Sequence, residues 1–166
     1  MPAPEDARRL KARAKITSHR IVGEDKDYMD FNFADAANTR DFDPRTYLSI
    51  LVAIAKADKD NGPPEFDFVR RRADRLGLDS EQFFQAVDQH FAIERQKVTR
   101  FTALVILKDA IALGSMDGNL SLPERGKIYS YAEKLDIARS DVDSLEKLVD
   151  EHRSLNRRWR QLVAGQ

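Results

Sequence analysis

The chain has 166 residues, which is enough for one compact domain with a buried core and requires no second one. Its 28 basic residues balance 28 acidic ones, so no overall charge attracts nucleic acid or anionic lipid, and we expect no nucleic-acid partner. The absence of cysteine excludes disulfides and thiolate metal sites, and no apolar run approaches the ~20 residues of a transmembrane segment, so the cytoplasm is the expected location.

Residues 1–43 are polar and weakly patterned, and we predict a polar N-terminal arm ahead of the domain. The first half of the arm is basic, but the acidic neighbours Glu5 and Asp6 favour an ordinary solvated surface over a phosphate-binding one. A short segment follows whose apolar residues we expect to pack on the domain, namely Tyr28, Met29, Phe31 and Phe33.

Residues 44–166 carry apolar side chains at helical spacing, and we predict a single all-α domain, a bundle of helices. No segment alternates with period two, so we expect no strand. The first helix of this domain starts at Asp43 and Pro44, which suit a helix cap and a first turn, and it ends near Asp58. The second spans about 62–77, and its surface is expected to carry Arg70, Arg71, Arg72 and Arg75.

Four further helices are predicted in the second half of this pattern. The third opens at Asp79 and carries a stripe that extends to Phe91, and the fourth, at about 98–112, is apolar on most sides and therefore central. The fifth opens with the capping-box spacing of Ser121 and Glu124. The last opens at 140–143, and its periodicity predicts an inward stripe of Leu145, Leu148, Val149, His152, Leu155, Trp159 and Leu162.

An internal repeat is predicted by identities that recur at a constant interval of 59 positions. Conservative pairs, such as Asp74 with Glu133, lie in the same register. Each copy consists of an apolar helix, an aspartate, a step of seven residues to a glutamate, and an amphipathic helix. The identical residues are Ala53, Asp58, Pro64, Glu65, Ala73 and Leu76 in the first copy and Ala112, Asp117, Pro123, Glu124, Ala132 and Leu135 in the second.

The loop of the second copy reads Met116-Asp-Gly-Asn-Leu-Ser-Leu-Pro-Glu124. It resembles the Ala-Asp-Gly-x-Ile-Ser-x-x-Glu pattern of the TerB-like tellurite-resistance family. This family includes TerB and the N-terminal domain of DnaJ-like co-chaperones. The first copy is similar but lacks glycine directly after Asp58. The resemblance covers about residues 44–151. It implies a bundle of about seven helices that acts as a noncatalytic stress-response module. Its paired acidic loops would hold a divalent cation, and it would work with a protein partner, including membrane-associated complexes.

Oxygen-bearing side chains in the two loops form the candidate metal site, because calcium takes six to eight oxygen ligands. A standard EF-hand is not expected, since Leu113 and Ser115 stand where its first ligands would be. Both loops would therefore have to converge on one ion, and calcium is the ion that we expect. The candidate ligands are Asp58, Asp60, Glu65, Asp109, Asp117, Asn119 and Glu124.

The same acids also have a simpler interpretation, because acidic residues gather at helix starts to cap them. On that interpretation the protein is a purely structural or protein-interaction domain without a metal. The residues leave both interpretations open. No phosphate-binding glycine loop or nucleophile elbow is present, and the three histidines lack metal-ligand spacing, so we expect no catalysis.

Overall fold

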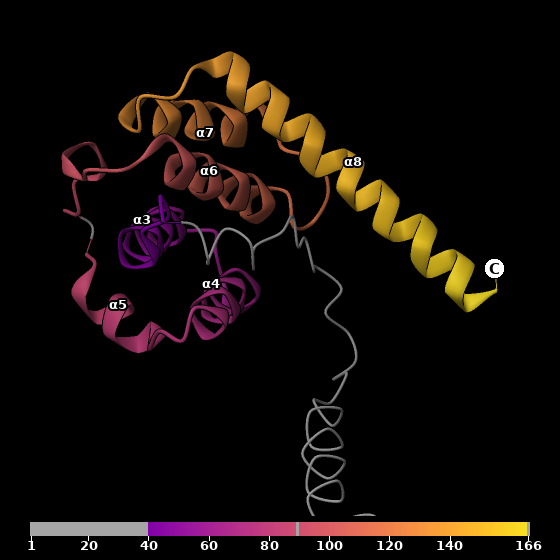
Figure 1. Ribbon diagram of the computed structural model, residues 1–166, viewed down its shortest axis with the longest axis horizontal. Helices are drawn as coiled ribbons and strands as arrows, with labels where there is room; N and C mark the ends of the chain where they lie inside the picture. Colours follow the sequence, from indigo (N-terminus) through magenta and orange to yellow (C-terminus); the bar gives the residue numbers. More distant parts are fainter. Residues whose placement is uncertain (1–39, 89, 166) are drawn as a thin grey trace, which may run out of the picture.

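The computed structural model describes residues 40–88 and 90–165, and within these ranges it contains helices but no strand. The all-α prediction is therefore confirmed for this part of the chain (Figure 1). Most of the predicted arm lies outside the described residues. The elements are α3 (Pro44–Ala57), α4 (Pro63–Arg75), α5 (Ser80–Ala86), the 3₁₀ turn η1 (Ile93–Arg95), α6 (Arg100–Gly114), α7 (Leu122–Lys134) and α8 (Arg139–Ala164).

Helices α3 and α6 form the centre of the core, as the apolar pattern of α6 predicted. In Figure 1, α6 lies between α3 on one side and α7 and α8 on the other. Nearly every residue of α6 from Thr102 to Leu113 is buried, which is why its apolar residues surround the whole helix. The largest fully buried side chains come mainly from these two helices, namely Tyr47, Leu48, Ile50, Leu51, Ile106, Leu107 and Ile111.

The predicted helix starts are mostly correct because they depend on local hydrogen bonds. The Asp43 side chain accepts from the backbone N–H groups of Arg45 and Thr46 and thereby caps α3. Asp79 caps α5 in the same way. Ser121 and Glu124 form the predicted capping box at the start of α7.

Three boundaries differ from the prediction. Helix α5 ends at Ala86, so Phe91 lies beyond it, because Lys56 from α3 donates to the backbone carbonyls of Phe84 and Val87 at its C-terminus. Helix α6 begins later than predicted, at Arg100, where the Thr99 hydroxyl caps it by accepting from the Thr102 N–H. Helix α8 begins at Arg139, without a side-chain cap.

Helices α4 and α7 begin and end at the same relative positions, 59 residues apart. Both are followed by a residue with a left-handed backbone, Gly77 with φ 67° and Asp136 with φ 58°. In both turns the next N–H reaches back to a carbonyl five residues earlier, from Leu78 to Ala73 and from Ile137 to Ala132. The glycine accepts this conformation without strain, whereas the aspartate is the only non-glycine residue with positive φ in the described ranges.

Candidate functional site

The acids of the first loop are engaged by hydrogen bonds and one ion pair. Asp58 accepts from the Asp60 N–H at 3.0 Å and pairs with the Lys127 ammonium of α7 at 3.1 Å. The backbone hydrogen bond from Asp60, followed by the contact with Lys127, lowers the pKa of the Asp58 carboxyl. Glu65 accepts from the Gly62 N–H at 2.9 Å at the start of α4, and Asp60 is exposed.

The second loop repeats the arrangement at its glutamate. Glu124 accepts from the Ser121 N–H at 2.8 Å, as Glu65 does from Gly62. Asp117 and Asn119 are exposed at the turn before α7. The two glutamates therefore serve helix starts, which is the role that the simpler interpretation gave them.

The first loop meets α7 at a small pocket of about 30 Å³, whose lining residues include both Asp58 and Glu124. Lys127 and Tyr131 of α7 line it as well, together with apolar side chains of α3 and α6. The Lys127 ammonium already supplies a positive charge to Asp58. Among residues 40–88 and 90–165, no three histidine or acidic side chains lie close enough to hold a metal ion together.

Asp109, the remaining predicted ligand, lies inside the core rather than at a surface loop. One carboxylate oxygen accepts from the Tyr47 hydroxyl at 2.5 Å, and the other pairs with the Arg72 guanidinium at 3.2 Å. The Lys108 ammonium lies 3.6 Å from the same oxygen as Arg72. Burial, and then the neighbouring Asp109 charge, raise the pKa of the Tyr47 hydroxyl.

This buried polar cluster corrects the prediction that Arg72 lies on the surface, because only 3% of Arg72 is exposed. Its guanidinium also lies over the Phe68 ring, 4.7 Å from the ring centre. The sequence contained one sign of this cluster, because Lys108 and Asp109 stand side by side in an otherwise apolar helix. Their partners could not be identified from the sequence, since Arg72 is 37 positions away from Asp109.

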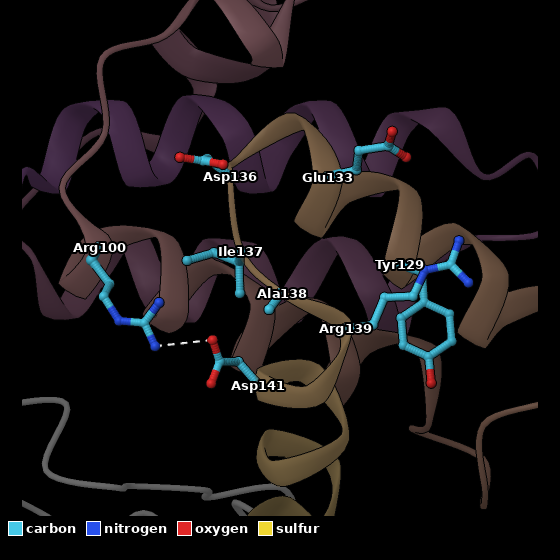
Figure 2. A pocket seen from close by; sticks show the side chains of 8 residues that line it. All are labelled: Arg100, Tyr129, Glu133, Asp136, Ile137, Ala138, Arg139 and Asp141. Carbon is cyan, nitrogen blue, oxygen red and sulfur yellow. Dashed lines mark hydrogen bonds and ion pairs between the residues drawn. The ribbon is translucent and has the colours of Figure 1, made fainter.

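A second pocket, of about 510 Å³, lies at the turn between α7 and α8 (Figure 2). The Arg100 side chain points toward Asp141 and pairs with it at 3.0 Å, while the Arg139 guanidinium lies over the Tyr129 ring at 5.0 Å. The Tyr129 hydroxyl donates to Asp143, and this hydrogen bond raises the pKa of the hydroxyl. Two of the charges that line the pocket therefore pair with each other across the start of α8, and a third contacts an aromatic ring.

Helix α8 consists of two unlike halves. In the inner half, residues 139–151, Val142 and Val149 are buried against the body, and Glu146 pairs with Arg125 of α7 at 2.5 Å. Arg153, just beyond it, donates to the Ser115 hydroxyl at 2.8 Å and to the Ala112 carbonyl at the end of α6. In Figure 1 the remainder of α8 extends past the ends of α6 and α7 to the C-terminus.

The outer half of α8, residues 152–164, exposes its apolar side chains. Trp159 is 63% exposed, so the prediction that it packs inward is wrong, and His152 is only half-buried. Trp159 lies on the same face of α8 as Leu148, which is 46% exposed in the inner half, so this face does not pack on the body in either half. The large exposed apolar residues of α8 are Leu148, Leu155, Trp159, Leu162 and Val163.

No helix in the described part of the chain is long and apolar enough to cross a membrane. In comparisons with known proteins, no protein-family model matches the chain, and no curated protein or solved structure matches it either.

Proposed function

We propose that the protein is a noncatalytic interaction module that binds an acidic, aromatic-rich protein segment through the outer half of α8. The observation that carries the proposal is the row of exposed apolar side chains on that half of the helix. Leu155, Trp159 and Leu162 are 55%, 63% and 73% exposed, and their spacing puts them on one helical face. Exposed apolar patches that are rimmed by polar residues mark interaction sites.

The chemistry of the partner follows from the charges around this face. The outer half of α8 contains no acidic residue, and beyond Arg153, whose guanidinium binds the end of α6, it carries Arg157, Arg158 and Arg160. Tryptophan and arginine are also the residues that contribute most often to binding energy at protein interfaces. An acidic segment with aromatic side chains matches both the arginines and the apolar face.

The loop acids support an interaction module more than a metal centre, because most of them already have structural partners. Glu65 and Glu124 cap helices, Asp58 pairs with Lys127, and Asp109 belongs to the buried cluster. We further propose that the domain is a duplicated helix–acidic loop–helix unit. The equal bounds of α4 and α7 and the equal roles of the two glutamates support the duplication.

The test is a titration of the full-length chain with a synthetic peptide of alternating aspartate and phenylalanine, followed by the fluorescence of Trp159, the single tryptophan. We expect saturable binding that weakens about tenfold or more in the Arg157→Glu, Arg158→Glu variant, since tenfold corresponds to only about 1.4 kcal/mol of lost charge contacts. A peptide with lysine in place of aspartate is the matched control. Equal responses to both peptides would contradict the proposal.

A second candidate function is calcium binding by a TerB-like stress-response module, and the pocket shared by Asp58 and Glu124 favours it. An ion there would replace the Lys127 ammonium beside Asp58 and recruit the exposed Asp117 and Asn119. Calorimetric titration with calcium, magnesium and manganese tests this function. Binding heat that disappears in the Asp58→Asn, Asp117→Asn variant and grows in Lys127→Met would support it, and no heat in any of the three proteins would exclude it.

A further inference from the structure

The surface proposed above has a complementary segment in the same chain, outside the described residues. Residues 24–35 read Glu-Asp-Lys-Asp-Tyr-Met-Asp-Phe-Asn-Phe-Ala-Asp, with five acids and one lysine. Apolar side chains alternate with these acids, at Tyr28, Met29, Phe31 and Phe33. This is the chemistry that the outer half of α8 is expected to recognise.

We propose that residues 24–35 bind to the outer half of α8 of the same molecule and cover the face around Trp159. The inference rests on the proposed function, because it names the occupant of that surface. It makes the N-terminal arm an internal ligand, with which any external acidic partner has to compete.

The place where the described chain begins makes this contact reachable. The Asp41 carbonyl accepts from the Thr99 and Thr102 hydroxyls at the start of α6. The neighbouring Arg100 pairs with Asp141 in the first turn of α8. The chain therefore enters the described body close to the N-terminal end of α8.

The length of the intervening chain matches the distance to be covered. Trp159 lies 18 residues after Asp141, which corresponds to about 27 Å along a helix that rises about 1.5 Å per residue. Phe33 and Phe31 precede Asp41 by 8 and 10 residues, and a chain can span at most about 3.3–3.6 Å per residue, or roughly 26–36 Å. The two phenylalanines can therefore reach the face between Leu155 and Trp159.

The charges on α8 favour the acidic segment 24–35 as the occupant of this face over the α8 helix of a second molecule. Two outer halves placed side by side would bring arginines against arginines, which opposes close approach. The inner half of α8 contains all the acids of the helix, but it packs on the body through Val142 and Val149. Because segment 24–35 is acidic, the arginines of the outer half attract it instead of repelling it.

The experiment measures how readily acrylamide quenches the fluorescence of Trp159 in the full-length chain. The test variant is Phe31→Ser, Phe33→Ser, and the matched control is Arg8→Gln, Arg9→Gln, which changes the arm outside residues 24–35. We expect quenching to increase about twofold in the test variant, because the Trp159 ring is covered in most wild-type molecules and exposed in the variant. Quenching should stay unchanged in the control. Circular dichroism verifies that each variant keeps its helices.

A synthetic peptide of residues 22–37 is then added to the test variant, and we expect it to restore the quenching of the wild type. If wild type and variant are quenched equally while the peptide still protects Trp159, the internal contact is wrong and the proposed function stands. If the peptide protects nothing, both are wrong. Protection in the wild type that disappears on dilution would assign the segment to a second copy and would overturn the contact within one molecule.

Discussion

The body of the domain and the outer half of α8 use similar apolar residues in opposite ways. Val149 is fully buried against the body, whereas Leu155, six residues later on the same helix, is 55% exposed. The two residues lie about 120° apart around the helix, because six residues correspond to about one and two thirds turns. Leu155 shares its face with Leu148, which is 46% exposed although it belongs to the inner half. The apolar residues of α8 therefore cover two faces, of which one packs on the body and the other does not. An apolar stripe therefore shows which face of a helix avoids water, but it does not show whether the chain itself covers that face.

The comparison predicts that substitutions in the body lower stability and that substitutions in the outer half of α8 affect only binding. The largest expected effect is at the buried cluster. Asp109→Asn removes the carboxylate charge that pairs with the buried Arg72 guanidinium, and we expect it to lower the free energy of unfolding by about 3–5 kcal/mol, the usual cost of breaking a buried ion pair. Denaturant unfolding measures it. Asp117→Asn, an exposed acid, is the control, and a similar loss there would contradict the assignment.

Val149→Ala and Leu155→Ala form a matched pair on the two halves of α8. We expect Val149→Ala to cost about 2 kcal/mol of unfolding free energy, because two buried methyl groups leave a cavity. Leu155→Ala should change the free energy by less than about 0.5 kcal/mol, as is usual for exposed positions. Thermal unfolding of both variants shows the difference. Equal losses would mean that the body extends under the outer half of α8.

The Asp58–Lys127 ion pair gives a smaller effect that depends on pH. The pKa of Asp58 is lower in the folded protein than its ordinary value of 3.8, so its stabilisation is present above that value and is lost as the pH falls through the folded pKa. We expect Asp58→Asn to cost about 0.5–1 kcal/mol at neutral pH, a modest amount because Lys127 is half exposed. Unfolding curves at neutral pH and near pH 2 test this, and a cost that persists at the lower pH would point to a cause other than charge.

Local signals explain which parts of the fold the sequence predicted. Asp43, Asp79 and Ser121 each cap a helix within three residues, so their roles can be inferred from short segments. The end of α5 was not predictable in this way, since it depends on Lys56 from another helix.

The candidate site was predicted less completely, because the position of each acid depends on partners far away in the sequence. Asp58 and Glu124 do line one pocket, as the predicted convergence of the loops requires. Asp109 instead belongs to a cluster with Arg72 and Tyr47, 37 and 62 positions away. Trp159 was predicted to be buried because periodicity alone does not show which apolar face of a helix the body covers.

The most direct test of the account is the binding of the aspartate–phenylalanine peptide to the full-length chain and to its Leu155→Ser, Leu162→Ser variant. Both leucines lie on the exposed face of α8, outside the core. The account predicts that the variant binds the peptide about tenfold more weakly or worse, which corresponds to losing about 1.4 kcal/mol or more of apolar contact. Equal affinity of the two proteins for the peptide would contradict the assignment of this face as the binding surface.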